Sequence, residues 1–336
     1  MNIHKYTREH FIPLKCTFDI VYKCNLKCIH CFQEENINNN YLPKIENIFK
    51  VIDELKQLGC MEVLLTGGEV FIRDDIFDIL SYIKSKKMGV VIFTNATLLT
   101  EEKIIKLKEF NIFKIGISVY GSCSEVHDRI TKVNGSFEKT INNIKLLKKY
   151  CIPVIGKVCL MKDNANDVSN IKNMFETLSV HYEISPFISE GICNDLSPIT
   201  NRMNDDQVIS AARIIGPLPP LPPKSSPVDE FNQQLLCGSG TVIMHIAADG
   251  EVYPCMSVHK SAGNAYNKSL RYIWENSEVF NKIRKIRYSD SACSKCDKNL
   301  ICVRCPGVAL EENGDFLGKP KEFCRLTELW EKAFQI

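Results

Sequence analysis

Six short apolar runs alternate with amphipathic stretches between residues 17 and 187 of this 336-residue chain. Such an alternation is typical of βαβ units, in which helices connect the strands of a parallel sheet. Six units are too few to close an eight-stranded barrel. The sequence therefore predicts an α/β fold built on a partial, TIM-like (β/α)6 barrel, with ligands bound at the carboxyl ends of the strands.

The spacing of apolar residues gives the expected elements. Strands are expected at 17–21, 62–66, 89–94, 114–119, 153–161 and 182–187. Helices are expected at 45–58, from residue 74 to about 84, and at 101–109, 136–150 and 168–178. Gly59 stands where a left-handed residue ends the first of these helices, and Asp74 is expected to cap the second.

Three cysteines follow the first expected strand within eight residues. Cys24, Cys28 and Cys31 have the spacing C-x3-C-x2-C. Thiolates select iron–sulfur clusters and thiophilic metals, and three of them on one loop hold three corners of a 4Fe–4S cube. The fourth iron then lacks a protein ligand and is open to a small molecule. The alternative is a zinc knuckle with His30 as a further ligand, although its place directly before Cys31 makes tetrahedral closure awkward.

Gly67, Gly68 and Glu69 follow the second expected strand. Glycine allows a ligand to approach the backbone closely. A Gly-Gly pair after a strand is usually only a turn, but this one comes one βα unit after the cysteine loop. The two features together favour a shared ligand site.

Composition narrows the setting of this site. The chain is 45% hydrophobic and 24% charged, and its net charge of +2 does not favour nucleic acid or an anionic membrane as a partner. The start of the sequence has no apolar signal region, and no apolar run approaches membrane-spanning length. A cytoplasmic location is therefore expected. Sixteen cysteines in such a chain indicate metal or cluster ligation more than disulfides.

These motifs together resemble those of radical S-adenosylmethionine (radical SAM) enzymes. That family combines C-x3-C-x2-C after the first strand with a Gly-Gly-Glu-Pro-like motif after the second, where this chain has Val70 in place of the proline. The resemblance implies that the open iron chelates the amino and carboxylate groups of SAM. It also implies that the backbone of Gly67, Gly68 and Glu69 binds the amino group.

Two further positions match this family. Thr94 and Asn95 follow the third strand, where Ala96 replaces a commoner glycine, and Ser118 on the fourth strand resembles a serine that contacts the SAM ribose. Each position also has an ordinary structural interpretation, because Asn95 suits a turn and Ser118 can simply fill a strand.

A proline-rich stretch at 216–227 interrupts the βα pattern. Its five prolines before Lys224 favour an extended, polyproline-like backbone. The sequence thus predicts a barrel at 1–215, a connector at 216–227 and a cysteine-rich domain at 228–336. This last part is expected to have fewer helical periods and a β-hairpin that turns at Asp249 and Gly250.

Seven cysteines lie beyond the connector. They are Cys237, Cys255, Cys293, Cys296, Cys302, Cys305 and Cys324. Two C-x2-C pairs alone would indicate a zinc ribbon. The whole pattern, in which Gly250 precedes Cys255 by five positions, resembles the SPASM domain, which carries auxiliary 4Fe–4S clusters in radical SAM enzymes.

The resemblance implies two auxiliary clusters, and so three 4Fe–4S clusters in all. Cys237, Cys255 and Cys305 would hold the first, together with an open site or a fourth ligand that the sequence does not locate. The ligands of the second, fully ligated cluster would be Cys293, Cys296, Cys302 and Cys324. Only Val303 and Arg304 separate Cys302 from Cys305, where the family usually has three residues, and this shortens the reach of Cys305.

Six cysteines remain outside these sets: Cys16, Cys60, Cys123, Cys151, Cys159 and Cys193. Free cysteine commonly behaves as a small buried hydrophobe, which is the expectation for most of them. Cys193 follows the sixth strand at its carboxyl end, where the active site of such a barrel opens. It is a candidate cluster ligand or hydrogen-atom donor.

The resemblance implies reductive cleavage of SAM to a 5′-deoxyadenosyl radical, which abstracts a hydrogen atom from the substrate. The auxiliary clusters would then accept an electron. The leading hypothesis is a maturase that introduces a thioether, a carbon–carbon crosslink or a related oxidation into a ribosomally synthesised precursor peptide. A flavodoxin or ferredoxin would supply electrons. Because Cys24 comes so early, no N-terminal leader-binding domain is expected, and a separate leader-binding protein or the barrel surface would recognise the leader.

Three alternatives stay open. Sulfatase-maturing enzymes place an Asp base directly after the cysteine that matches Cys255, whereas this chain has Met256. A small molecule such as a cofactor precursor or a tetrapyrrole is another possible substrate class. The non-enzymatic alternative is an iron–sulfur or zinc scaffold that carries electrons, against which the open fourth iron argues.

Overall fold

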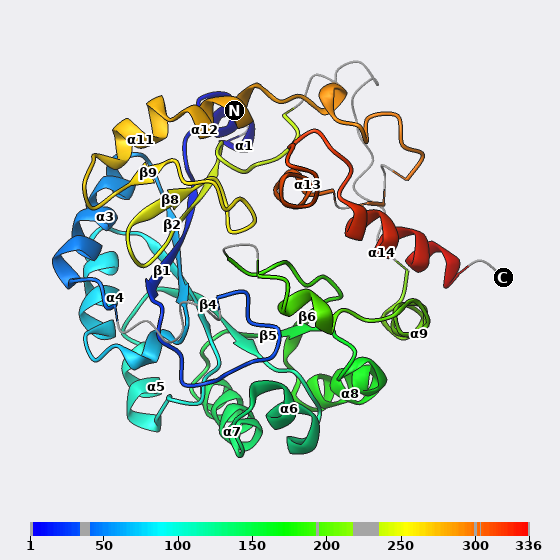
Figure 1. Cartoon of the computed structure of the whole chain (residues 1–336). Coiled ribbons are helices and arrows are strands. Elements are labelled where there is room, and N and C mark those ends of the chain that lie inside the picture. Colours follow the sequence, from blue (N-terminus) through cyan, green and yellow to red (C-terminus); the bar gives the residue numbers. More distant parts are fainter. Residues whose placement is uncertain are drawn as a thin grey trace.

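A computed structural model describes residues 3–33, 41–192, 195–217, 235–298, 301–302 and 304–334. One curved sheet of nine strands organises these parts. Figure 1 shows the elements arranged round a ring, with helices on the outside of the sheet. In the described part of the chain, no helix combines the length and the apolar composition needed to cross a bilayer.

Six parallel strands form the barrel part of the sheet. They are β1 (Lys15–Val21), β2 (Glu62–Gly67), β3 (Gly89–Thr94), β4 (Ile112–Ser118), β5 (Val154–Cys159) and β6 (His181–Ser185). Each pairs in parallel with the next in the sequence. β6 lies at an edge of the sheet, so the barrel is not closed. The predicted α/β fold with a partial barrel is confirmed.

Helices connect these strands and cover their outer face (Figure 1). They are α3 (Ile45–Gln57), α4 (Ile76–Ser85), α5 (Glu101–Leu107), α6 (Ser124–Thr131), α7 (Ser136–Lys149) and α8 (Val168–Leu178). Each buries one apolar face, as α3 does with Ile48, Ile52 and Leu55. Burial of these faces against the strands supplies most of the hydrophobic stabilisation of the barrel.

The expected cap of α4 is wrong. The helix begins after Asp75 rather than Asp74, and the Asp75 side chain does not cap it. The Asp75 carboxylate instead accepts two hydrogen bonds from the buried Arg73 guanidinium, at 2.7 and 2.8 Å. A bidentate pair with arginine is stronger than a single capping bond, which explains the difference. α6 was not predicted either.

Three more strands continue the same sheet beyond β1. They are β7 (Ile243–Ile246), β8 (Glu251–Tyr253) and β9 (Gly263–Asn264). β7 pairs in parallel with β1, and β8 returns antiparallel to β7 through Asp249 and Gly250. Gly250 has a φ of 89°, which a glycine adopts without strain. The predicted hairpin is confirmed, but it extends the barrel sheet.

Helices also occur beyond the connector, where the sequence predicts fewer helical periods than in the barrel. The described C-terminal helices are α11 (Leu270–Asn276), α12 (Glu278–Lys285), α13 (Pro306–Asn313) and α14 (Lys321–Lys332). α11, α12 and α13 have only seven or eight residues each, whereas α14 has twelve. Ser269 caps α11 and Ser277 caps α12 with side-chain hydrogen bonds.

α14 packs against α9 (Asp205–Ile215), the last helix before the proline-rich stretch. Gly216 follows α9 and accepts a hydrogen bond at its carbonyl from Trp330 Nε1 at 3.0 Å. Residues 218–227 of the predicted connector lie outside the described residues. The division at 1–215, 216–227 and 228–336 stays a prediction.

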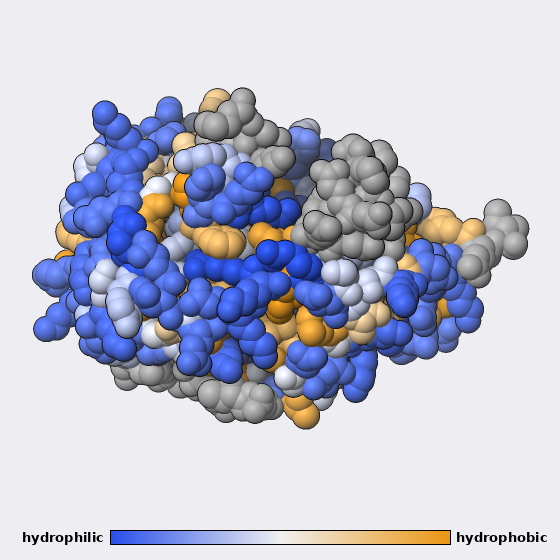
Figure 2. Space-filling model, turned by 90° about the horizontal axis from the view of Figure 1, so that it is seen from above, coloured by the Kyte–Doolittle hydropathy of each residue, from blue (hydrophilic) through white to orange (hydrophobic). Residues whose placement is uncertain are grey.

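The N-terminal helix α1 (Ile3–Glu9) lies beside α12 at the top of Figure 1. Figure 2 looks down on this face and shows mainly hydrophilic residues, with apolar ones in small groups between them. The chain after α1 is tied to α11 by a hydrogen bond from Trp274 Nε1 to Phe11 O at 2.7 Å. The start of the barrel is therefore fixed against the C-terminal part.

Candidate active site

The loop after β1 brings the thiols of Cys24, Cys28 and Cys31 together. Burial raises the pKa of the Cys28 thiol well above its usual range, and the neighbouring Cys31 and Cys24 raise it further. A backbone hydrogen bond from Lys27 N to Thr131 O at 2.9 Å fixes the loop to the end of α6. Iron binding must displace the thiol protons, so the site is neutral and preformed before it is loaded.

Asn95 ties the cysteine loop to the end of β3. Its Nδ2 donates to Cys24 Sγ at 3.8 Å and to Asn25 Oδ1 at 3.0 Å. Its Oδ1 accepts from Thr97 N at 2.9 Å. Asn95 therefore supports the loop that carries the cysteines, and its role in binding SAM stays a prediction.

Gly67 and Gly68 lie against the backbone of the chain that leads into the cysteine loop. Gly68 N donates to Val21 O at 2.9 Å. A Cβ on Gly67, which has a φ of 129°, would overlap Val21 O, and a Cβ on Gly68 would overlap Lys23 O. The glycines are therefore required by close packing of the protein on itself. Their proposed contact with the SAM amino group is a separate matter and stays a prediction.

The Glu69 side chain points into the protein and is fully buried. Its carboxylate accepts hydrogen bonds from Thr94 Oγ1 at 2.7 Å and from Asn95 N at 2.8 Å. Burial raises the pKa of Glu69, while these hydrogen bonds oppose the rise. Glu69 thus fastens the end of β2 to the end of β3, so a contact of SAM with this residue would involve its backbone.

Ser118 ends β4, and its side chain forms a hydrogen bond with Tyr120. Tyr120 is a site residue that the sequence interpretation missed. Burial raises the pKa of its phenol well above the usual range, and the nearby Cys28 and Cys159 thiols add to the rise. Its ring packs edge-on against His30, with ring centroids 4.6 Å apart. Its position two residues beyond a strand, at the carboxyl edge, is the signal that would have found it.

Cys159 ends β5 and lies close to Cys28 and Tyr120. Burial raises the pKa of its thiol to about 12. Cys159 is therefore part of the wall around the cysteine loop, although its sequence context suggested only a core residue. Cys193, the candidate ligand or hydrogen-atom donor, lies outside the described residues.

The other cysteines divide by burial. Cys16 and Cys60 are buried in the main core, as expected. Cys123 is half-buried at the start of α6. The expectation is wrong for Cys151, which is exposed in the turn after α7 with a φ of 58°.

Cys237, Cys255 and Cys305 come together in the C-terminal part. Burial raises the pKa of Cys255 to about 12, and Cys237 and Cys305 raise it further. The three residues line a small pocket. Its apolar walls come from Leu236, Val258, Ile283, Ile286 and Phe316. The two-residue spacing before Cys305 therefore does not keep it away from the other two, and ligation of a cluster by this group stays a prediction.

Cys293, Cys296, Cys302 and Cys324 form a separate group. Burial raises the pKa of Cys302 and of Cys324, and in each case the other members of the group add to the rise. Cys324 lies on α14, and the other three lie before α13. The structure brings together the four residues expected for the second auxiliary cluster, whose presence stays a prediction.

The donor sets suit iron–sulfur clusters in their chemistry. Each consists of buried or half-buried thiols, which are the ligands of 4Fe–4S cubes. No disulfide joins the described cysteines. Within the described ranges, no three His, Cys, Asp or Glu side chains converge as closely as a single metal ion requires. In a cube each thiolate binds a different iron, so the thiolates stand further apart.

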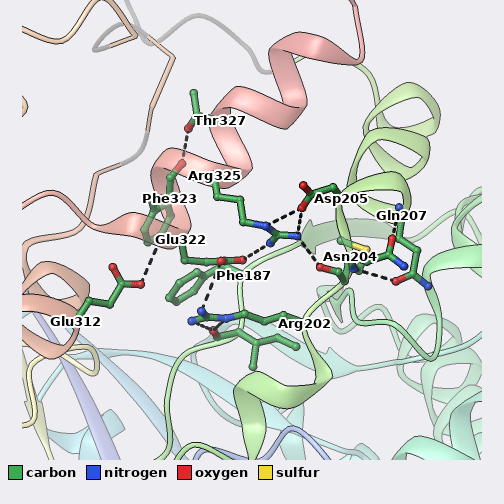
Figure 3. A network of polar contacts seen from close by, with 12 residues as sticks. Phe187, Arg202, Asn204, Asp205, Gln207, Glu312, Glu322, Phe323, Arg325 and Thr327 are labelled. Carbon is green, nitrogen blue, oxygen red and sulfur yellow. Dashed lines mark hydrogen bonds and ion pairs between the residues drawn. The ribbon is translucent and has the colours of Figure 1, made fainter.

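A polar network holds α14, and with it Cys324, to the barrel part (Figure 3). Glu322 Oε1 accepts from Arg325 Nη1 at 3.0 Å, and Glu322 Oε2 lies 3.5 Å from Arg202 Nη1. Arg325 Nε also donates to Asp205 Oδ1 at 2.9 Å. Because Asp205 begins α9 and Glu322 lies in the first turn of α14, the network fixes the two helices to each other beside the predicted cluster.

A buried acid and a histidine form another polar cluster, between β1 and β7. Asp19 Oδ2 lies 3.0 Å from His245 Nε2 and accepts from Gln33 Nε2 at 3.0 Å. Asp19 faces away from the helices that cover Phe18 and Ile20, because side chains alternate along a strand. The sequence interpretation missed this pair, since it arises only from the pairing of β7 with β1.

Comparison with known proteins identifies the family. Residues 19–175 match the radical SAM superfamily, and residues 237–297 match the SPASM iron–sulfur cluster-binding domain. The chain therefore carries a radical SAM domain and a SPASM domain. Both domains imply an enzyme that uses SAM and iron–sulfur clusters, as the cysteine pattern predicts.

Individual relatives cover most of the chain. An AdoMet-dependent heme synthase from Methanosarcina barkeri is 26% identical over 334 residues, which are 91% of this chain and 94% of the relative. The antilisterial bacteriocin subtilosin biosynthesis protein AlbA of Bacillus subtilis is 28% identical over 323 residues, which are 91% of this chain and 70% of the relative. The crystal structure of Streptococcus suis SuiB bound to the precursor peptide SuiA has a TM-score of 0.69 and 18% identity, over 95% of this chain and 78% of SuiB. This last likeness shows the fold.

Proposed function

We propose that this chain is a radical SAM maturase that oxidatively modifies a ribosomally synthesised precursor peptide, forming a thioether, a carbon–carbon crosslink or a related bond. The observation that carries this proposal is the combination of a three-thiol site at the barrel edge with two further thiol groups in the SPASM part. Similarity to the subtilosin biosynthesis protein and the fold shared with SuiB support the peptide class.

The proposal assigns one 4Fe–4S cluster to each thiol group, three in all. SAM would bind the open iron at Cys24, Cys28 and Cys31, beside the backbone at 67–69, Asn95 and Ser118. Once bound and reduced, SAM and this cluster supply the 5′-deoxyadenosyl radical. The two auxiliary clusters would accept the electron when the substrate radical is oxidised.

The chain's own residues would position this chemistry. Asn95 and Glu69 hold the loop that carries the cysteines, and Tyr120 excludes water from one side of it. Oxidation of the substrate radical also releases a proton. The Asp19–His245 pair is an acid–base pair on the inner face of the sheet, suited to accept that proton.

Partners and setting follow from the same proposal. A flavodoxin or ferredoxin would reduce the first cluster, and a separate leader-binding protein would present the precursor peptide. The enzyme would work in the cytoplasm, where thiols stay reduced. Cys193 would act as a cluster ligand or hydrogen-atom donor near the carboxyl end of β6.

Oxidation of a small molecule such as a tetrapyrrole is the second candidate function. It is favoured by the heme synthase relative, which aligns with this chain over 94% of its own length. A sulfatase-maturase activity is less favoured, because Met256 stands where such enzymes place an Asp base.

Anaerobic reconstitution tests the proposed function. The reconstituted protein should hold about 12 irons, as three clusters of four, and should form 5′-deoxyadenosine from SAM in the presence of a reductant. Mass spectrometry after turnover should then show loss of hydrogen from a cysteine- or aromatic-containing peptide encoded beside this protein. If the protein bound zinc in place of iron, or left SAM uncleaved, the proposal of a radical SAM enzyme would be refuted. Turnover of a porphyrin precursor with unchanged peptides would select the second candidate.

A further inference from the structure

Arg304 lies where the two thiol groups of the C-terminal part meet. In the sequence it stands between Cys302 of the four-thiol group and Cys305 of the three-thiol group. In the structure Cys293 and Cys302 of the four-thiol group and Cys237 of the three-thiol group all lie near enough to act on its charge. One side chain therefore faces members of both groups.

Tyr288 holds the Arg304 side chain in this place. The guanidinium carbon lies 3.6 Å from the centroid of the Tyr288 ring, a close cation–π contact. Tyr288 is 1% exposed, and its hydroxyl donates to Cys293 O at 3.2 Å. The tyrosine thus links the arginine to the loop that begins the four-thiol group.

The Arg304 charge has little else to neutralise it. Its Nε is buried and has no acceptor within the described residues, and in those residues it forms no ion pair with a carboxylate. The side chain is half-buried, and an unpaired buried N–H on a cation favours a negative group nearby. The thiols become such a group when they lose their protons to bind iron.

We propose that Arg304 is a positive charge shared by the two auxiliary clusters, which makes both easier to reduce and lessens the repulsion between them. The inference rests on the three-cluster assignment made above. Two cubes with thiolate ligands each carry net negative charge, and reduction of either adds to it. A fixed cation between them favours the added electron on both, because net charge and hydrogen bonds set the potential of such clusters.

Redox titration monitored by electron paramagnetic resonance tests this role without any substrate. The samples are the reconstituted wild type and the variants Arg304→Gln, Arg304→Lys and Lys295→Gln. Arg304→Gln should move the midpoint potentials of both auxiliary clusters to more negative values and leave the SAM-binding cluster unchanged. Arg304→Lys keeps the charge and should move them less. Lys295→Gln removes an equal charge from an exposed position between Cys293 and Cys296, where water screens it, and should have the smallest effect.

The outcomes separate this inference from the proposed function. If the wild type assembles only one cluster, the three-cluster assignment fails. If it assembles three and Arg304→Gln moves neither auxiliary potential, or only one, the shared role is overturned. Should Arg304→Gln fail to assemble clusters, Tyr288→Leu releases the guanidinium while keeping its charge. Unchanged auxiliary potentials in Tyr288→Leu would equally overturn the proposal.

Discussion

The cysteine loop of the barrel and the cysteines of the C-terminal part form their thiol groups in different ways. The three cysteines of the barrel lie within eight residues on one loop. The other seven lie on segments between residues 237 and 324, joined by short helices and a hairpin. The first group is positioned by strand ends that would be in place without iron. The second group forms only when segments far apart in the sequence pack together, and bound metal would stabilise that packing.

The contacts of each group reflect this difference. Backbone hydrogen bonds and the buried Glu69 fix the barrel loop to β2, β3 and α6. The C-terminal thiol groups are held mainly by side-chain contacts. Tyr288 packs against Arg304, and Glu322 forms ion pairs on the helix that carries Cys324. We therefore expect substitutions in the barrel loop to abolish SAM cleavage. Substitutions in the C-terminal part should instead alter the local order of that part and the reduction potentials of its clusters.

The largest expected effect is on SAM cleavage. Cys28→Ala should reduce 5′-deoxyadenosine formation to background and lower the iron content from about 12 to about 8 atoms, since one cube of four loses a ligand. Iron analysis and chromatography of the SAM products measure both. Cys151→Ala, at an exposed cysteine, should change neither. Full activity of Cys28→Ala would show that the barrel loop is not the SAM-cleaving site.

Iron removal should separate the two regions. Anaerobic chelation is expected to increase amide hydrogen exchange strongly at 287–298 and 304–320, because local order there depends on ligation. β1 to β6 should keep most of their protection, because their hydrogen bonds and apolar faces do not need metal. Hydrogen–deuterium exchange with mass spectrometry measures the difference. Equal loss of protection in both regions would contradict the comparison.

Gly68→Ala should destabilise the barrel by about 3 kcal/mol, the upper range for forcing extra atoms into a packed site. The added Cβ would overlap the Lys23 carbonyl oxygen, and backbone cannot move aside as a flexible side chain does. Gly135→Ala is the matched control, because its φ is 78° but its Cβ would meet nothing within 4 Å. The control should lose only about 1 kcal/mol, the cost of left-handed backbone. Urea unfolding measures the free energy of unfolding of both variants. Equal losses in Gly68→Ala and Gly135→Ala would mean that the close packing under the cysteine loop does not contribute to stability.

The smallest expected effect concerns Glu311 of α13, at the junction of the two regions. Burial, followed by repulsion from Glu190 and Glu312, raises the pKa of Glu311 from 4.5 to about 7. The folded protein therefore binds a proton that the unfolded chain releases, so the free energy of unfolding falls as the pH rises from about 4.5 to 7. We expect a loss of about 1 kcal/mol after allowance for its partial exposure.

Glu311→Gln should remove this pH dependence and be the more stable protein at pH 8. Thermal unfolding at pH 5 and pH 8 measures it. The exposed Glu102→Gln serves as control and should follow the wild type. The prediction would be contradicted if the wild type, compared with Glu311→Gln, became more stable between pH 5 and pH 8. That result would mean that the folded protein stabilises the ionised carboxylate of Glu311.

The barrel could be predicted well because its elements carry their own signals. α8 occupies the predicted residues 168–178, and the six strands lie within a few residues of the expected ranges. Apolar periodicity reports burial directly, and burial against one sheet is what forms these elements. The predicted cap of α4 at Asp74 was wrong because the helix begins one residue later, at Ile76. Asp75 instead pairs with Arg73, whose guanidinium is held by tertiary hydrogen bonds to Ile20 O and Pro43 O.

The C-terminal part was harder to predict for a related reason. Three of its four described helices have only seven or eight residues, and an apolar run of that length does not distinguish a helix from a strand. The resemblance to the SPASM domain implied which thiols belong together, and the structure brings those sets together. It gave no indication of Tyr288 beneath Arg304, since these residues are sixteen positions apart and meet only through folding.

The sequence by itself determined the partial barrel, because apolar periodicity reports burial, and its motifs gave the family resemblance that implied the membership of the thiol groups. Only the tertiary structure decided that the hairpin extends the barrel sheet, that Asp19 meets His245, and that Arg304 faces two thiol groups. Each of these depends on segments far apart in the chain. A local pattern cannot specify such contacts, because they form only when the whole core is buried.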